Sequence, residues 1–188
     1  WLEQIDAERD NVRSALAWLE SANDGEGLLR LAGAAEPLWN YRSYRGEGRA
    51  WLERALEQAR DVTVPPDALI RALLSAGFLA RNQGDYPRAI AHGTHCLDVA
   101  IAAHHEMGIS VGHHLLGYVA MAEGDYAHAR VQFEEEQQIA RVSGAHGDEA
   151  GAWLELGRTS YGQGNFAQAV TEIEHALTMQ RDLDDRWN

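Results

Sequence analysis

The stretches Gly84-Asp85-Tyr86, Gly124-Asp125-Tyr126 and Gly164-Asn165-Phe166 repeat one short pattern at steps of 40 residues. A glycine stands seven residues before each stretch and an alanine five residues after its first residue, at Gly77, Gly117, Gly157, Ala89, Ala129 and Ala169. A period between about 20 and 50 residues is typical of stacked repeats, each too small to bury a core alone. The pattern therefore predicts a solenoid, a fold that presents surfaces and seldom carries out chemistry.

The composition argues against several functional classes. The chain has 188 residues, a formal net charge of −13 and a pI near 5.0. We expect no nucleic-acid binding, because phosphate contact requires a basic surface. All 16 basic residues are arginines, which removes the lysine of a phosphate-binding loop and any Schiff-base lysine. No run approaches the roughly 18 apolar residues that span a bilayer, and we expect no membrane contact.

The cysteine content and the first residue add two expectations. Cys96 is the only cysteine in the sequence. An internal disulfide is therefore impossible, which fits a reducing, cytoplasmic location. The chain begins at Trp1 without an initiator methionine, and we expect it to be a segment of a longer protein.

Apolar residues at helical spacing predict helices throughout the chain. Before the regular repeats we expect three helices, over Ile5–Ser21, Glu26–Arg42 and Glu47–Arg60. Breaks are expected at Asn23-Asp24-Gly25, at residues 43–46 and at Asp61–Pro66, where the paired prolines can only begin a new helix. These segments divide one continuous solenoid domain into a lead-in helix (1–25), a degenerate first repeat (26–62) and three regular repeats (63–188).

We expect each regular repeat to contain two helices joined at the glycine–Asp/Asn–aromatic turn. Asp85, Asp125 and Asn165 stand near the start of the second helix, where a side-chain oxygen can cap free backbone amides. We expect the glycine before the turn and the alanine after it to face each other, so that the two helix axes approach closely. The turn aromatics Tyr86, Tyr126 and Phe166 are expected to pack across the base of their own hairpins.

These positions resemble the tetratricopeptide repeat. The last repeat matches most fully, with Trp153, Leu156-Gly157, Gly164-Asn165-Phe166, Ala169 and Ala176-Leu177. The previous repeat departs at His113 and Glu136, and the one before has Gly93 and Cys96 where an aromatic residue and an alanine are usual. The unit of 40 residues exceeds the family's usual length of about 34. The resemblance implies an all-α fold of antiparallel helix hairpins stacked as a right-handed solenoid.

Two stretches near the front resemble a narrower group. Residues 8–18, Glu-Arg-Asp-Asn-Val-Arg-Ser-Ala-Leu-Ala-Trp, and residues 46–56, Gly-Glu-Gly-Arg-Ala-Trp-Leu-Glu-Arg-Ala-Leu, are similar to the repeat arms of bacterial signal-transduction (STAND) ATPases. Such arms follow the ATPase module in LuxR-type and SARP-type transcriptional regulators. The resemblance implies a parent protein with separate ATPase and output domains.

The tetratricopeptide resemblance also implies a ligand groove lined by the first helix of each unit. Carried over position by position, the groove would contain Arg30, Asn40, Tyr41, Arg71, Phe78, Arg81, Asn82, His114, Tyr118, Met121, Arg158 and Tyr161. Four arginines would stand beside four aromatic residues there, a combination that suits carboxylates, phosphates and extended peptides. The alternative is that the arginines pair with acids across the groove and the aromatics only fill space.

Catalytic and metal sites find little support. His92, His95 and Cys96 follow the i, i+3, i+4 spacing of a zinc site, but Cys96 falls on a buried repeat position. Packing or surface roles are the alternative that we favour over metal binding. Acidic runs such as 134–136 lie on one helix and point in different directions, so they do not form a carboxylate pair across a cleft. No nucleophile elbow or glycine-rich phosphate loop is present.

These observations predict a scaffold or sensor domain that binds a protein, a peptide or a small anionic effector, with no cofactor and no metal. The alternative is a self-association module, a homo-oligomer formed through an open terminal repeat. A metal-dependent enzyme is the third and least supported hypothesis.

The close helix approach gives a first prediction. Replacing Gly117 by leucine should overpack the contact and lower the free energy of unfolding by about 1–3 kcal/mol. Thermal unfolding followed by circular dichroism measures the change. An unchanged melting temperature in the Gly117→Leu variant would contradict the assigned role of this glycine.

Overall fold

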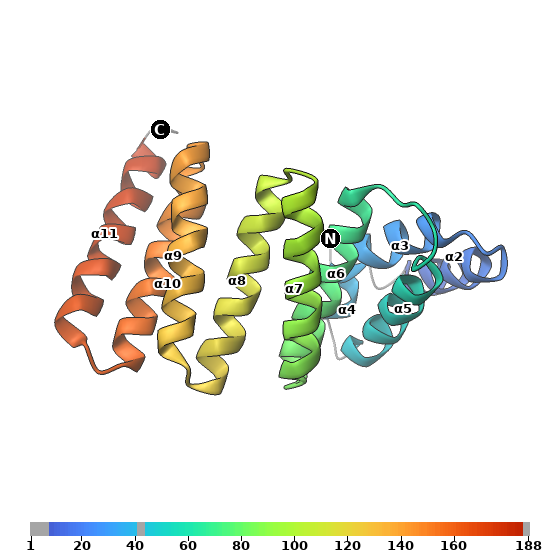
Figure 1. Cartoon of the computed structure of the whole chain (residues 1–188), viewed down its shortest axis with the longest axis horizontal. Coiled ribbons are helices and arrows are strands. Elements are labelled where there is room, and N and C mark those ends of the chain that lie inside the picture. Colours follow the sequence, from blue (N-terminus) through green and yellow to red (C-terminus); the bar gives the residue numbers. More distant parts are fainter. Residues whose placement is uncertain (1–7, 41–43, 186–188) are drawn as a thin grey trace. The chain divides into compact units, whose positions relative to one another are not determined.

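The computed structural model describes residues 8–40 and 44–185, and the regular secondary structure in those two ranges is entirely α-helical (Figure 1). The all-α fold class predicted from the sequence is confirmed. The helices are α2 (Arg9–Ser21), α3 (Gly25–Ala34), α4 (Glu36–Asn40), α5 (Arg45–Gln58), α6 (Pro66–Asn82), α7 (Tyr86–Ala102), α8 (Glu106–Glu123), α9 (Tyr126–Ser143), α10 (His146–Gly162) and α11 (Phe166–Asp185).

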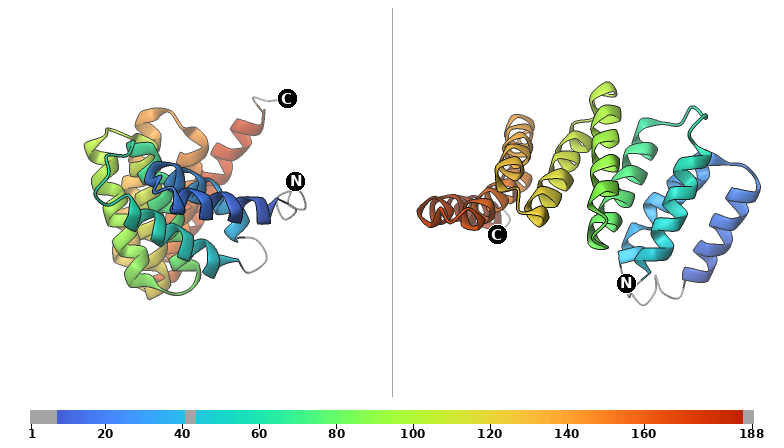
Figure 2. Two further views of the ribbon diagram at one scale, coloured as in Figure 1. Left: turned by 90° about the vertical axis from the view of Figure 1, so that its right-hand side faces the viewer. Right: turned by 60° about the horizontal axis from the view of Figure 1, so that its bottom comes forward.

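The helices group into two compact units, Trp1–Gly108 and Ile109–Asn188. In the first unit α2 packs on α3, α3 packs on α5 and α6, and α6 packs on α5 and α7 (Figure 2). In the second unit α10 packs on both α9 and α11. Each unit therefore consists of helix hairpins laid against one another.

The expected helix Glu26–Arg42 is wrong as a single element. It is divided at Ala35 into α3 and α4, and residues 41–43 lie outside the described residues. The cause is Pro37, which would clash with the carbonyl of Gly33 in a continuous helix. The break lets the Trp39 side chain enter the core, where its indole Nε1–H donates to the carbonyl of Ala32 at 3.1 Å.

The glycines at the hairpin turns adopt a backbone conformation that is strained for other residues. Gly84, Gly124 and Gly164 have φ values of 78°, 80° and 79°, in the left-handed region that glycine enters without strain. The expected caps are confirmed at two turns. The Asp85 carboxylate accepts from the amide of Arg88 at 3.3 Å, and that of Asp125 accepts from the amide of His128 at 3.0 Å.

At the glycines inside the hairpins a side chain of the second helix fills the space, and of the alanine contacts expected at Gly117 and Gly157 only the one at Gly157 is found among the described residues. A Cβ atom at Gly117 would lie 2.6 Å from Cε1 of Phe133, and one at Gly157 would lie 2.6 Å from Cγ1 of Ile173. The backbone oxygen of Ala169 would be 3.3 Å from the same atom at Gly157. The first helix of the hairpin therefore has no room for a side chain at this position.

The expected place of the turn aromatic is wrong for Tyr126. Its ring lies against Gly162 of α10, where a Cβ atom would be 2.3 Å from Tyr126 Cε1. The aromatic residue thus packs on the first helix of the following hairpin rather than across its own. Phe166 takes the same turn position in the last hairpin and is 60% exposed.

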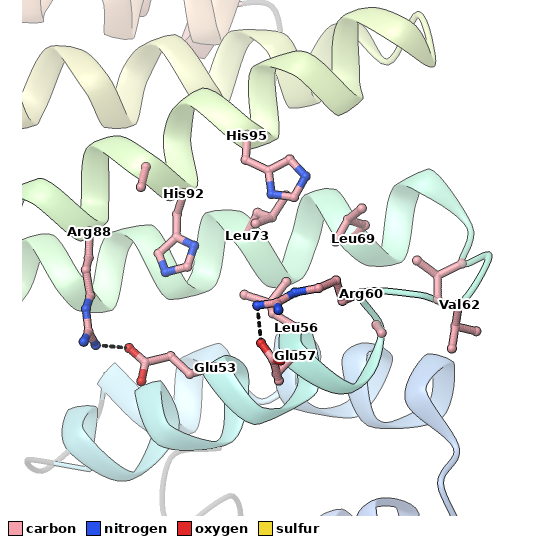
Figure 3. Close-up of a pocket in the computed structure, with 13 residues that line it drawn as sticks. Glu53, Leu56, Glu57, Arg60, Val62, Leu69, Leu73, Arg88, His92 and His95 are labelled. Atoms are coloured by element: carbon pink, nitrogen blue, oxygen red, sulfur yellow. Dashed lines mark hydrogen bonds and ion pairs between the residues drawn. The ribbon is translucent and has the colours of Figure 1, made fainter.

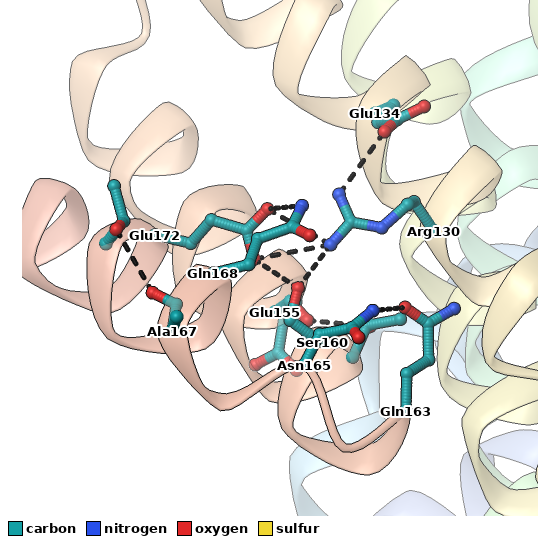
Figure 4. Close-up of polar contacts among 11 residues, drawn as sticks. Arg130, Glu134, Glu155, Ser160, Gln163, Asn165, Ala167, Gln168 and Glu172 are labelled. Carbon is teal, nitrogen blue, oxygen red and sulfur yellow. Dashed lines mark hydrogen bonds and ion pairs between the residues drawn. The ribbon is translucent and has the colours of Figure 1, made fainter.

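A buried ionic network joins the hairpins of the second unit (Figure 4). Arg130 on α9 donates to the Glu172 carboxylate on α11 at 3.0 and 3.3 Å and also to Ser160 Oγ on α10. The Glu172 carboxylate also accepts from Ser160 Oγ at 2.6 Å and from Gln168 Nε2 at 3.0 Å. Glu172 is buried, so these donors take the place of the water that its charge has lost.

This network gives a prediction for stability. Arg130→Met should lower the free energy of unfolding by about 3–5 kcal/mol, because a buried carboxylate loses its cation. The double variant with Glu172→Met should recover most of that loss. Urea titration followed by circular dichroism measures both.

The matched control is Arg60→Met, which breaks an exposed pair with Glu57 and should cost less than about 1 kcal/mol. A loss in Arg130→Met no larger than that of the control would show that the network does not hold the hairpins together.

Candidate binding surfaces

The predicted groove residues of the second unit lie on α8 and α10. Two of them, Tyr118 and Arg158, both contact Glu155. Tyr118 Oη on α8 donates to Glu155 Oε1 at 2.9 Å, and Arg158 Nη1 donates to both oxygens at 3.2 and 3.3 Å. Glu155 is buried, whereas the Arg158 side chain is 55% exposed. The acid therefore fixes a phenol and a guanidinium side by side. We call His114, Tyr118, Leu154, Arg158 and Tyr161 the α8–α10 face.

His114 extends this arrangement along α8. Its ring packs edge-on against Tyr118 with 4.5 Å between centroids, and its Nδ1 is 2.9 Å from Glu136 Oε1 on α9. Glu136 is buried at the repeat position where alanine is usual. This departure is visible in the sequence, but its partner, a histidine on the preceding helix, is not. An acid at a small-residue position was the available signal.

The other two groove residues of this unit are placed differently from one another. Met121 is half-buried against the apolar cluster of Ala120, Ala129, Phe133 and Leu156. Tyr161 is 66% exposed, and its ring lies 5.4 Å from the ring of Phe166 at the hairpin turn. Tyr161 is thus the accessible aromatic residue of the face.

In the first unit the predicted groove residues lie on α3, α4 and α6. Arg30 donates to Glu26 one turn earlier at 2.8 Å. Asn82 Nδ2 donates to Asn40 Oδ1 at 3.2 Å and accepts from Arg81 at 3.1 Å, so these three residues are brought together.

The remaining groove residues of this unit differ in exposure. Phe78 is half-buried and Arg71 is exposed. Within the described residues Arg71 has no hydrogen-bond or ion-pair partner. Tyr41 lies outside the described residues.

The structure also contains a pocket that the sequence did not reveal. It has a volume of about 790 Å³ and lies between α5 and α7, with α6 as its floor (Figure 3). We call it the α5–α7 pocket. Its lining consists of Glu53, Leu56, Glu57, Ala59, Arg60, Val62, Val64, Leu69, Leu73, Arg88, Ala91, His92 and His95. These residues come from three helices and a loop, so no local motif marks them.

The three residues with zinc-site spacing, His92, His95 and Cys96, point to different places. Cys96 points into the core, where its thiol is fully buried and donates to the carbonyl of Gly108 at 3.8 Å. Burial raises the pKa of this thiol to about 11. His92 and His95 instead line the pocket, and burial lowers the pKa of His92. In the part of the chain that the structure describes, no group of three or more potential ligands could hold a metal ion.

Comparison with known proteins supports the repeat assignment. The family model described as tetratricopeptide repeat matches residues 150–183. No curated protein matches the chain. Across residues 8–40 and 44–185, no helix has the length and apolar character needed to cross a membrane.

Several solved structures are similar to the chain. BtubC (BKLC) from P. vanneervenii has a TM-score of 0.80 at 15% identity, over 96% of this chain and 78% of that one. The apo form of RapI has a TM-score of 0.81 at 16% identity, over 96% and 66%. A Podosopora anserina kinesin light chain with nearly identical TPR-like repeats has a TM-score of 0.73 at 15% identity, over 98% and 94%. Together with the matched repeat, these likenesses show that the chain is an array of tetratricopeptide-like helix hairpins.

Proposed function

We propose that this chain is a protein-binding scaffold that holds an extended peptide segment on the α8–α10 face. The observation that carries the proposal is the exposed pair Arg158 and Tyr161, set beside a Tyr118–Glu155 contact that is already formed. Arginine and tyrosine are the residue types that most often dominate binding energy at interfaces. A TPR-like fold supports the same class of function.

The geometry lowers the cost of binding. Glu155 already holds the Arg158 guanidinium, so less side-chain entropy is lost when a partner arrives. Leu154, Arg158 and Tyr161 follow one another at helical spacing, and Leu154 is 41% exposed. A peptide with a carboxylate between two apolar side chains would match this order of apolar, cationic and aromatic groups.

The wider setting is part of the proposal. The front of the chain resembles the repeat arms of bacterial ATPase-linked transcriptional regulators, and in such a parent the bound segment would shift the ATPase between resting and assembled states. A small anionic effector is the alternative ligand for the same arginine. With either ligand, this chain acts as a binding module and not as an enzyme.

A peptide-display library panned on the purified chain tests the proposal. We expect the enriched peptides to carry carboxylates next to apolar residues. In fluorescence anisotropy with one such peptide, Arg158→Gln should weaken binding at least tenfold, which corresponds to about 1.4 kcal/mol. Glutamine can still donate to Glu155, so the variant removes the charge and leaves the buried acid a partner.

The matched control is Arg181→Gln on α11, which makes the same charge change away from the α8–α10 face and should leave the affinity unchanged. Equal affinities of wild type and Arg158→Gln would place the peptide elsewhere and reject this face. A library that yields no binding peptide would reject peptide binding by the chain.

A second candidate function is self-association, and the surface of α11 favours it. Phe166 and Val170 are 60% and 55% exposed, and Leu177 follows them on the same stripe of the helix at 49%. The equivalent aromatic Tyr126 is covered by Gly162 of a following helix. A second copy of the chain could cover Phe166 in a similar way.

Sedimentation equilibrium tests this candidate. The wild type should show an average mass above the monomer value of 20.8 kDa at high concentration. Val170→Glu should weaken the association at least tenfold, because it buries an unpaired carboxylate at the contact. Val131→Glu on α9, where the valine is similarly exposed, is the control and should behave as wild type. A strictly monomeric wild type would exclude self-association.

A further inference from the structure

The α5–α7 pocket has an apolar interior on the opposite side of α6 from the predicted groove residues of that helix. Leu69 and Leu73 of α6 form its floor, Leu56 of α5 lines one wall, and Val62 and Val64 line one end. Val62 is 49% exposed, which leaves a branched apolar side chain in water at the mouth. A bound molecule with an apolar body would remove this surface from water.

The acidic groups of the pocket are already neutralised. Glu53 accepts from Arg88 at 2.6 Å and from Arg49 at 2.9 Å, while Glu57 pairs with Arg60 (Figure 3). Burial alone would raise the pKa of Glu53, but hydrogen bonds and charges from Arg49 and Arg88 lower it below its ordinary value. The pocket therefore carries no unpaired negative charge, although the whole chain has a net charge of −13.

Two imidazoles supply hydrogen-bond donors that the rest of the pocket does not use. His92 and His95 are three residues apart on α7, so they are neighbours on one side of the helix, and both line the pocket. Figure 3 shows them projecting from α7 toward the space above α5 and α6. Neither ring has a hydrogen-bond partner among the residues that the structure describes. Two adjacent N–H donors can hold the two oxygens of one carboxylate.

The dimensions set the size of the ligand. One wall runs from Glu53 on α5 to Arg60 just beyond the end of that helix, and the other runs from Arg88 to His95 on α7. At 1.5 Å per residue the α7 wall is about 10 Å long. The volume of about 790 Å³ falls within the range of small-molecule sites. An extended medium-length acyl chain, such as that of octanoate, spans about this distance.

From these observations we propose that the α5–α7 pocket binds a small hydrophobic carboxylate, with its apolar body on Leu56, Leu69 and Leu73 and its carboxylate hydrogen-bonded to His92 and His95. This site lies outside the peptide-binding face proposed above and does not depend on it. An organic cation would have to compete with Arg49, Arg88 and Arg60 for the nearby acids. A bare metal ion would lack a third ligand.

Titration of the purified chain with octanoate and, separately, with octanol tests the proposal by NMR and calorimetry. Octanoate should saturate, shift the imidazole signals of His92 and His95, and raise the pKa of His92, because a nearby anion favours the imidazolium form. Octanol has the same apolar body without the carboxylate and should bind at least tenfold more weakly.

Three variants locate the site. The double variant His92→Leu/His95→Leu should lose at least tenfold in octanoate affinity and keep its affinity for octanol. Ala91→Trp, on the exposed side of α7, should fill the pocket and abolish binding of both compounds. His128→Leu on α9, which removes an exposed histidine of the other unit, is the control and should bind octanoate as the wild type does.

Binding of octanoate that survives both the double variant and Ala91→Trp would place it elsewhere and overturn the proposal. Equal affinities for octanoate and octanol would show that the histidines do not recognise the carboxylate. Failure of octanoate to saturate at millimolar concentration would exclude a carboxylate of this size. If circular dichroism shows that the double variant is unfolded, Ala91→Trp and the His92 titration still test whether octanoate binds in the pocket.

Discussion

The contact between a bare backbone and a facing side chain is the constraint on which the regular hairpins depend. At Gly117 the Phe133 ring occupies the space of a missing side chain, and at Gly157 the Ile173 side chain does the same. Such contact fixes the rotation of each helix about its own axis, because only the side that carries the glycine can approach the facing side chain so closely. Once the rotation is fixed, the outward positions are fixed too. Arg158, the next residue along α10, is rotated by about 100° from Gly157 and is exposed.

Buried acids then make the register of the second unit specific. Glu136, Glu155 and Glu172 are each buried and each accept hydrogen bonds from another helix, through His114, Tyr118 and Arg130. A well-packed apolar residue at these positions could give equal or greater stability. A one-turn slip between helices, however, would leave a charge buried without a partner. We infer that the acids select one alignment of the hairpins, and that the α8–α10 face is assembled as a consequence.

The sequence predicted those features that repeat, and it failed where a contact depends on one particular pair. The turn glycines, the Asp85 and Asp125 caps and the inward position of Cys96 follow from the 40-residue period. The break at Ala35 was missed because the apolar stripe continues through it, although Pro37 was a visible signal. The Arg130–Glu172 pair and the α5–α7 pocket bring together residues more than 25 positions apart. These residues stand at positions that do not recur from one repeat to the next. No periodicity can reveal such contacts.

Helix α6 connects the two surfaces of the first unit. Successive residues of an α-helix are rotated by about 100°, so Leu69 and Leu73 project on the side opposite to Arg71, Phe78 and Asn82. The first pair forms the floor of the α5–α7 pocket, and the second group includes the residues predicted to line a groove. A molecule seated against Leu69 and Leu73 would also contact α5 and α7, and α5 and α6 already pack closely. The pocket floor and the predicted groove residues of the first unit are therefore opposite sides of one helix, and the packing of α6 on α5 and α7 sets the position of both.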